Sequence, residues 1–198
     1  MECYTADWNV TLHMGCSRIY VRAFMITIEG YLLQGKLESA LKQLVGEESW
    51  RGRELRVPDS RRRWDMAYQI QGHTTVVEFD GDQHYWDSLK IKVDAEKDAV
   101  ARSLGYSVVR IPYWVQLTTE TAQHYFGIPA QISQDFPHGF ITTKIFPASF
   151  SEMGVSRFSR EFSALPENTK NAVLSSLRDR AQEHGAEYVL PHSLRHML

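Results

Sequence analysis

Two acidic residues stand two positions apart in the segment TTVVEFDGDQHYW, which covers residues 74–86. Side chains alternate between the faces of a β-strand, so Glu78 and Asp80 are expected on one face and Val77 and Phe79 on the other. Burying neighbouring carboxylates costs several kcal/mol unless a cation compensates them. A hard metal ion is the simplest such cation. The alternative is that the two acids lie on the solvated face of an edge strand.

A third carboxylate is expected beside this pair. The segment WDMAYQI is typical of a strand, QGH of a turn and TTVVEFD of a second strand, as in an antiparallel hairpin. Asp65 would then lie across from the end that carries Glu78 and Asp80. Mg²⁺, or Mn²⁺ in its place, binds one or two carboxylates and keeps waters that substrate phosphates replace. The sequence therefore predicts that Asp65, Glu78 and Asp80 bind a metal ion in a site for phosphate chemistry.

Lys97 lies on the apolar stripe of a helix that is predicted to begin at Asp87 or Ser88 and to end at Leu104. Val93 and Lys97 are four residues apart on the stripe expected to face the sheet. A buried ammonium group needs an anion, which the carboxylates or a bound phosphate would supply. Alternatively, the Lys97 stem packs on the core while its ammonium group reaches water.

Two further residues are candidates for the same site. Glu38 lies beside the apolar stripe of a helix predicted over Lys36–Val45, which makes it a fourth acid. His84 follows Gly81 at the end of the acidic strand. A histidine there suits a general acid or base, and it equally suits a structural role with hydrogen-bond partners.

Arginine is concentrated in the segment WRGRELRVPDSRRRW, residues 50–64, whose local charge is +4. These arginines are Arg51, Arg53, Arg56, Arg61, Arg62 and Arg63. We expect them to contact the phosphates of a nucleic acid, unless they form a solvated loop. Trp50 and Trp64 flank the run and either stack on unpaired bases or belong to the core. Arg110, in a strand predicted over residues 106–112, contacts phosphate or pairs with an acid.

In their order, these segments resemble the PD-(D/E)xK nuclease superfamily, and within it the branch of the Vsr-like (very-short-patch-repair) endonucleases. The shared features are a helix with an acid, a strand with Asp, an acid-x-acid strand, Gly, His, a helix and the strand GYSVVRIP. The resemblance runs from Asp65 to Pro112, with the Glu38 helix added. It implies that Asp65 and Glu78 bind the metal ion and that Glu38 positions the site through water.

Asp80 departs from the pattern of that superfamily, because it occupies the place where the superfamily usually has a lysine. The resemblance assigns this lysine to the attacking water and the charged transition state. Either Lys97 or His84 would have to take over that role. We favour His84 as the general acid or base and Lys97 as an electrostatic partner.

The length of 198 residues suits one domain with an appendage. We predict an α/β restriction-endonuclease-like fold, in which a mixed β-sheet of about four or five strands is flanked by helices and followed by a helical C-terminal elaboration. Residues 1–30 form an N-terminal extension that can hold a strand, and residues 31–118 form the nuclease-like core. The C-terminal elaboration covers residues 119–198, with a helix near 167–184.

Composition limits the cellular setting and the partners. The net charge of −2 gives no overall basic character, so a nucleic acid must be bound by a local patch. Cys3 and Cys16 are too few for a disulfide framework or a structural zinc site. The apolar segment 19–28 is too short and too charged to span a membrane and lacks the layout of a signal peptide. We expect a cytoplasmic protein without membrane contacts.

The expected activity is metal-dependent hydrolysis of DNA phosphodiester bonds by an endonuclease that uses Mg²⁺ or Mn²⁺. One alternative is a catalytically decayed nuclease-fold module that only binds DNA. Another is a nuclease that acts on RNA. A homodimer would suit the cutting of both strands, although no segment of the sequence marks a dimer face.

Overall fold

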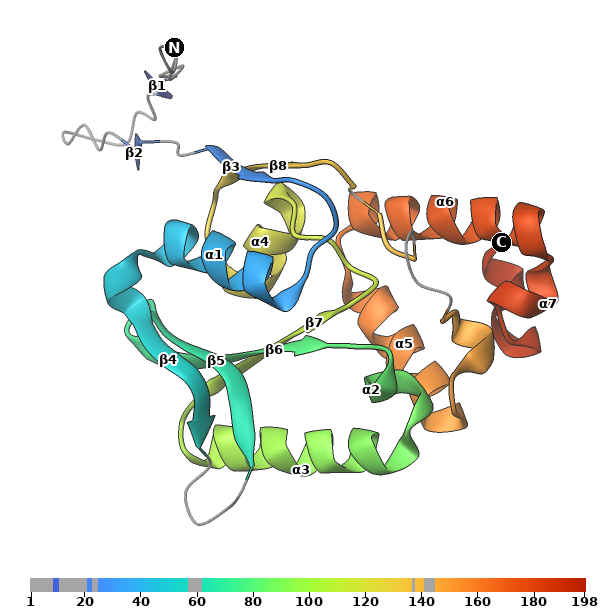
Figure 1. Ribbon diagram of the computed structural model, residues 1–198, viewed down its shortest axis with the longest axis horizontal. Coiled ribbons are helices and arrows are strands. Elements are labelled where there is room, and N and C mark those ends of the chain that lie inside the picture. The colour runs from blue at the N-terminus through green and yellow to red at the C-terminus, as the bar shows by residue number, and fades with distance from the viewer. Residues whose placement is uncertain (1–8, 11–20, 23–24, 57–61, 137, 141–144) are drawn as a thin grey trace.

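The computed structural model describes residues 9–10, 21–22, 25–56, 62–136, 138–140 and 145–198 (Figure 1). Its centre is a four-stranded sheet in the order β4-β5-β6-β7. The strands are β4 (Trp50–Arg56), β5 (Arg63–Ile70), β6 (His73–Asp80) and β7 (Ser107–Pro112). The first three are antiparallel neighbours, and β7 is parallel to β6. The protein therefore has the predicted mixed sheet, with four strands in it.

The β5–β6 hairpin is confirmed, and its turn explains its register. Gln71 and Gly72 have φ values of 50° and 83°, the left-handed conformation at both central positions that a tight two-residue turn requires. Ile70 pairs with His73 on either side of this turn. The pairing continues in the same register to Met66 and Val77. Asp65 and Glu78, one position further along, therefore come level with each other.

Helices cover both faces of the sheet. Helix α1 (Gln34–Val45) lies on one face and α3 (Ser88–Ser103) on the other (Figure 1). Val77 and Phe79 pack in the core cluster that contains α1, whereas Val76 packs in a second cluster with residues of α3. Glu78 contacts α3 through Lys97. Strand β6 therefore alternates between the two faces as predicted, and both faces are buried.

The connection from β6 to β7 carries the helix that faces the acids. It consists of α2 (Gln83–Trp86) followed by α3, and this crossover allows β7 to run parallel to β6. The Asp87 carboxylate caps α3 by accepting hydrogen bonds from two backbone N–H groups of its first turn. The helix ends before Gly105, which has a φ of 77°. These boundaries agree with the predicted helix.

The C-terminal third packs on the sheet end where β6 and β7 finish. The remaining helices are α4 (Thr119–Phe126), α5 (Glu152–Ala164), α6 (Glu167–His184) and α7 (Ala186–Val189), with 3₁₀ turns η1 (Glu47–Ser49), η2 (Pro147–Ser149) and η3 (His192–Met197). Helix α6 confirms the predicted helix. Helix α5 was not predicted. An aromatic core built around Trp114 and Phe158 joins α5 and α6 to α2.

Four short strands lie outside the central sheet. They are β1 (Asn9–Val10), β2 (Val21–Arg22), β3 (Met25–Ile28) and β8 (Gln131–Gln134). Strand β3 pairs in parallel with β8, which lies in the part of the chain predicted as a helical C-terminal elaboration. Among the helices of the described residues, none has the length and apolar character needed to cross a membrane.

Candidate metal centre

Asp65 and Glu78 meet where the β5–β6 hairpin opens. The backbone N–H of Asp65 donates to Oε1 of Glu78 at 3.0 Å, and the backbone N–H of Phe79 donates to Oδ2 of Asp65 at 3.0 Å. Each carboxylate thus satisfies a backbone donor of the opposite strand and is fixed in place by it. Within the described residues, Oδ1 of Asp65 and Oε2 of Glu78 accept no hydrogen bond. These two oxygens are free to bind a cation.

Lys97 reaches this pair from α3. Its Nζ lies 2.7 Å from Oε1 of Glu78, and both side chains are almost completely buried. Burial raises the pKa of Glu78 to about 7, and the charge of Asp65 adds to the rise, while Lys97 and Arg110 oppose it. One ammonium group therefore does not compensate two carboxylates here, and the pair retains an excess of negative charge when both acids are ionised.

Asp80 lies on the same face of β6 as Glu78 but in a different environment. Its side chain is fully buried, and its Oδ1 lies 2.8 Å from Nη1 of Arg110 and 3.3 Å from Nδ1 of His84. Its Oδ2 accepts a hydrogen bond from Nη2 of Arg157, a residue of α5. Both oxygens are thus occupied by cationic groups of the chain. Asp65, Glu78 and Asp80 do not form one group of converging ligand atoms among the described residues.

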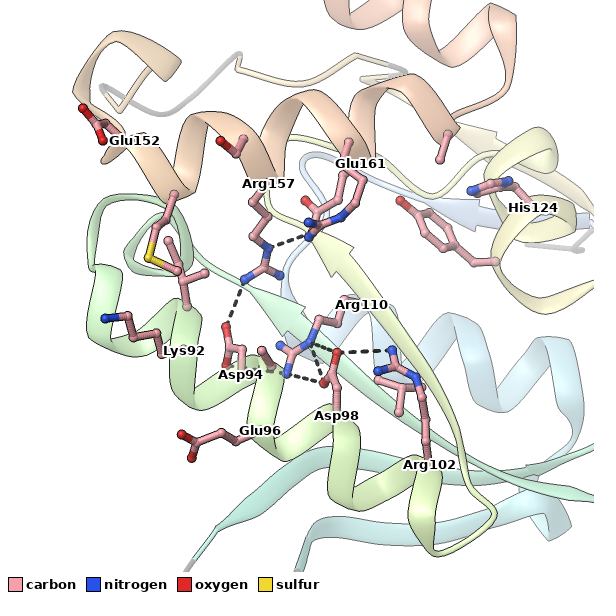
Figure 2. Close-up of a pocket in the computed structure, with 18 residues that line it drawn as sticks. Lys92, Asp94, Glu96, Asp98, Arg102, Arg110, His124, Glu152, Arg157 and Glu161 are labelled. Atoms are coloured by element: carbon pink, nitrogen blue, oxygen red, sulfur yellow. Dashed lines mark hydrogen bonds and ion pairs between the residues drawn. The ribbon is translucent and has the colours of Figure 1, made fainter.

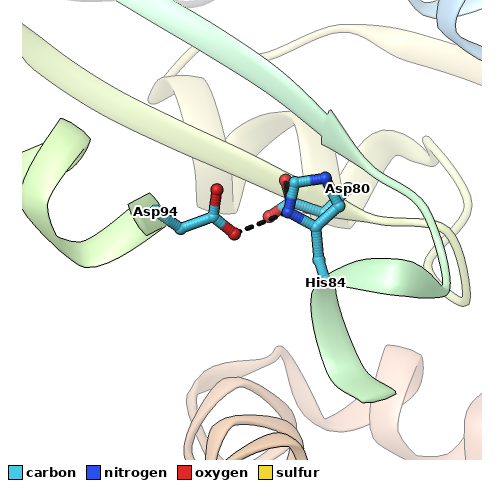
Figure 3. Close-up of side chains that lie close together, drawn as sticks. All are labelled: Asp80, His84 and Asp94. Carbon is cyan, nitrogen blue, oxygen red and sulfur yellow. Dashed lines mark hydrogen bonds and ion pairs between the residues drawn. The ribbon is translucent and has the colours of Figure 1, made fainter. Parts of the chain in front are cut away.

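His84 also belongs to the Asp80 environment and not to the Asp65–Glu78 pair. Its Nδ1 lies 2.5 Å from Oδ2 of Asp94, and Figure 3 shows this contact, with the Asp80 carboxylate next to the ring. Burial opposes the ionisation of Asp94, yet the hydrogen bond with His84 and the charges of Arg110 and Arg157 lower its pKa. In this arrangement His84 has the structural role that the sequence left open as an alternative.

Asp80, His84 and Asp94 offer ligand atoms within 4.8 Å of one another, the spacing of a metal site. The guanidinium groups of Arg110 and Arg157 already contact the oxygens of both carboxylates. A divalent ion placed among them would meet two positive charges in a medium that screens poorly. We therefore assign the candidate metal centre to Asp65 and Glu78.

Glu38 lies on α1, away from this centre. Its carboxylate pairs with Lys42 at 3.1 Å and accepts a hydrogen bond from Arg53. Burial opposes ionisation, but these two partners lower the pKa of Glu38 below its ordinary value. No hydrogen bond or ion pair in the described part of the chain joins Glu38 to Asp65 or Glu78, so its action through water stays a prediction.

Much of the arginine run is paired with acids of the chain. Arg53 contacts Glu38, Arg62 contacts Glu96 and Arg63 contacts Glu54. Arg51 and Arg56 are exposed on β4 and have no ion pair with a described residue, while Arg61 lies outside the described residues. Residues 50–56 form an edge strand, so this part of the run is not the solvated loop that was the alternative to phosphate binding.

The structure decides the remaining alternatives. Arg110 takes the acid-pairing alternative, with its Nε donating to Asp98 at 3.0 Å and its Nη1 to Asp80. Trp64 is fully buried in the core and cannot stack on a base in this conformation. Trp50 is partly buried against Tyr68.

Two members of the Asp80 environment were missed by sequence reasoning. Asp94 precedes Lys97 by three residues on the same helix, and that spacing was a signal that could have revealed it. Arg157 gave no local signal, because the residues it contacts lie far away in the sequence: its hydrogen bond with Asp80 joins positions 77 residues apart.

A cleft of about 1030 Å³ runs between α3 and α5 (Figure 2). Five lysines or arginines and five acids line it, so the cleft has no net attraction for a polyanion. Arg110 and Arg157 line the cleft, whereas Asp65, Glu78 and Lys97 do not. The cleft is therefore separate from the candidate metal centre.

Comparison with known proteins assigns no family to the chain. No protein-family model, no curated protein and no solved structure matches the chain. The assignment of a function therefore depends on the geometry of the described residues and on the resemblance of the segments from Asp65 to Pro112.

Proposed function

We propose that this chain is a metal-dependent endonuclease with a restriction-endonuclease-like core, which hydrolyses phosphodiester bonds of DNA. The observation that carries the proposal is the meeting of Asp65, Glu78 and Lys97 at the open end of one hairpin. Two carboxylates, each held by a backbone N–H group of the opposite strand, and an ammonium group 2.7 Å from one of them form a site suited to a phosphate ester and a divalent ion.

The residues fit a hard divalent ion such as Mg²⁺ or Mn²⁺. Asp65 and Glu78 each anchor one oxygen on the protein backbone and leave the other without a hydrogen bond, as a preformed oxygen-ligand site requires. They would hold the ion between β5 and β6. When bound, such an ion supplies Lewis-acid polarisation of a phosphoryl oxygen and a more acidic bound water.

Lys97 supplies the positive charge that Asp80, a carboxylate at the position of the superfamily's lysine, cannot supply. A phosphodiester gains negative charge as water attacks it, and a fixed ammonium group beside the site stabilises that charge. Lys97 is held there by its ion pair with Glu78, with the helix α3 as its rigid support. We therefore assign to Lys97 the role of the superfamily's strand lysine, in preference to His84, which is engaged by Asp94.

Exposed arginines next to the hairpin would position the DNA backbone. Arg56, which has no ion pair with a described residue, lies in register with Arg63 at the β4–β5 end that carries Asp65, whereas Arg63 would have to exchange its contact with Glu54 for a phosphate. Both side chains are exposed. Contacts between arginine and phosphate fix a nucleic acid without reading its sequence, so the proposal predicts salt-sensitive binding with little sequence preference from these residues.

Cleavage of supercoiled plasmid in the presence of Mg²⁺ tests the proposal. Asp65→Asn and Glu78→Gln keep the size of each side chain and remove its charge, and either change is expected to abolish cleavage. Glu187→Gln, which alters an exposed acid of α7, is the matched control and should cleave like the wild type. Cleavage that persists unchanged in Asp65→Asn and Glu78→Gln would refute the site.

A second candidate function is DNA binding without cleavage. The observation that favours it is Asp80, which takes the place of the superfamily's lysine and is enclosed by Arg110 and Arg157. This function predicts binding that weakens steeply with salt and no cleavage with Mg²⁺ or Mn²⁺. The same assay with an RNA substrate separates a nuclease that acts on RNA.

A further inference from the structure

Arg157 belongs to the C-terminal helices, and its positively charged side chain is buried beside acids of the sheet and of α3. It lies on α5, and its side chain is only 5% exposed. Its Nη1 lies 3.0 Å from Oδ2 of Asp94 and 3.2 Å from the carbonyl oxygen of His84, and its Nη2 donates to Asp80. Its Nε donates to Glu161 at 2.7 Å, one turn further along α5. Figure 2 shows Arg157 reaching from α5 toward Asp94 on α3.

These contacts are those of a cation bound by two carboxylates. Asp80, Asp94 and His84 present converging ligand atoms, as in a metal site, and both acids are buried. Buried carboxylates that face each other require a positive charge between them. A metal ion from solution can supply that charge, and so can a guanidinium group from the chain. In this protein, Arg157 bridges Oδ2 of Asp80 and Oδ2 of Asp94.

We infer that Arg157 serves as an internal substitute for a metal ion between Asp80 and Asp94, and that it thereby confines divalent-metal binding to the Asp65–Glu78 pair. The second half of this inference rests on the proposed function. The first half stands on the contacts of Arg157 alone. In this view the C-terminal helices determine how many metal ions the sheet domain binds.

Arg110 contacts the same acids but cannot replace Arg157. Its Nε and Nη2 both bond to Asp98, so most of its donors serve a third carboxylate. It approaches the Oδ1 atoms of Asp80 and Asp94, at 2.8 Å and 3.5 Å. Oδ2 of Asp80 contacts Arg157, and Oδ2 of Asp94 contacts both Arg157 and Nδ1 of His84. Removing Arg157 would therefore leave Oδ2 of Asp80 without a partner among the described residues, and Oδ2 of Asp94 with His84 alone.

The docking of α5 against α2 is built to place this guanidinium. The Ser151 hydroxyl donates to the carbonyl oxygen of Tyr85, and the Tyr85 hydroxyl donates to Glu161. Gly154 lies so close to the same carbonyl that an added Cβ would stand 1.7 Å from it. The Arg157 guanidinium also lies over the Tyr85 ring, 5.0 Å from its centroid. Helix α5 is thus fixed at several points around Arg157.

Counting bound Mn²⁺ by equilibrium dialysis of the full chain at neutral pH tests the inference. Arg157→Met removes the guanidinium charge while keeping an unbranched side chain, and it is expected to bind one Mn²⁺ more per chain than the wild type. Arg157→Lys keeps the charge and should bind the same number as the wild type. Arg160→Met, on the exposed face of α5 beside the same cleft, is the control and should also bind the wild-type number.

The decisive quantity is the difference in the number of bound Mn²⁺ ions between the variant and the wild type. This difference tests the role of Arg157 independently of the proposed function. If the wild type binds no Mn²⁺ and Arg157→Met binds one, the proposed function fails and the role of Arg157 stands. If Arg157→Met folds and binds the same number as the wild type, the inference is overturned.

A further variant covers the case in which Arg157→Met does not fold. The double variant Asp80→Asn with Arg157→Met removes one negative charge together with the positive one and deletes a ligand. Recovery of a cooperative thermal transition, without an additional Mn²⁺, supports charge compensation of Asp80 by Arg157. Failure of the double variant to fold, where Arg157→Met also fails, contradicts it.

Discussion

The buried carboxyl group of Glu78 should make the metal-free protein lose stability as the pH rises. Burial raises the folded-state pKa of Glu78 to about 7 from an ordinary value of 4.5. The folded state therefore holds the proton more tightly than the unfolded state between these values. The stabilising effect of this proton is complete below pH 4.5 and is lost as the pH rises through about 7. Glu78→Gln, which does not titrate, should lack this component of the pH dependence.

The size of this loss of stability follows from the shift in the pKa of Glu78. One pKa unit corresponds to about 1.4 kcal/mol, so Glu78 alone should lower the free energy of unfolding by about 3 kcal/mol between pH 4.5 and 8. For a chain of this length, that difference corresponds to a change in Tm of about 6 to 12 °C. Loss of the Lys97 partner in Glu78→Gln shifts stability at both pH values, so the change between the two pH values isolates Glu78.

Urea denaturation in EDTA at pH 5 and pH 8 measures this difference, with Glu187→Gln as the matched control. The wild type and Glu187→Gln should lose about 2.5 kcal/mol more than Glu78→Gln between pH 5 and pH 8. Adding Mn²⁺ at pH 8 should restore stability to the wild type, because the ion compensates the ionised pair, and should restore little to Glu78→Gln. An equal pH dependence in wild type and Glu78→Gln would show that Glu78 is not held in a poorly solvated, acid-rich position.

Three further outcomes are expected. Lys97→Met should slow single-turnover plasmid cleavage by about 100-fold or more, whereas His84→Gln should slow it less and chiefly lower the Tm, and the reverse order would return the catalytic role to His84. Gly154→Ala should lower the free energy of unfolding in urea by about 1 to 3 kcal/mol, since the new Cβ overlaps the Tyr85 carbonyl, and an unchanged value would contradict the close docking of α5. Trp64→Ala should lower the free energy of unfolding by about 3 to 5 kcal/mol and leave the affinity of the folded protein for single-stranded DNA unchanged at constant salt, and a weaker affinity would indicate base stacking.

The parts of the fold that local rules control could be predicted from the sequence. The hairpin depends on a turn of two residues, Gln71 and Gly72, and the alternation of β6 depends only on strand geometry. Lys97 could be placed correctly on the buried face of its helix, but the predicted stripe is inexact. Val93 is exposed, and Ile91, Asp94 and Ala101 are the residues that share the buried face with Lys97. Asp65 could be brought level with Glu78 because a two-residue turn fixes the register of both strands of the hairpin.

The parts that depend on distant contacts could not be predicted. Trp64 is the second residue of β5 and lies in an arginine-rich segment, and only the packing of α3 and β6 around it makes it a core residue. The arginines of that segment have a high local charge in the sequence, but Glu38, Glu54 and Glu96 neutralise three of them in the fold. Charge counted along a sequence window differs from charge counted in space whenever strands and helices bring other windows alongside.

The contrast between Glu78 and Asp80 shows why strand alternation alone does not identify a metal ligand. Both acids lie on one face of β6, and a rule based on alternation treats them alike. Glu78 is buried, pairs with one lysine and lies near the charge of Asp65, so burial and this second acid raise its pKa. Both oxygens of Asp80 contact guanidinium groups, one of them from a helix 77 residues away. A divalent cation is attracted to an uncompensated pair and repelled from a compensated one. Whether an acid on a buried strand is a metal ligand therefore depends on which arginines and lysines the rest of the fold brings to it, and this property belongs to the tertiary structure.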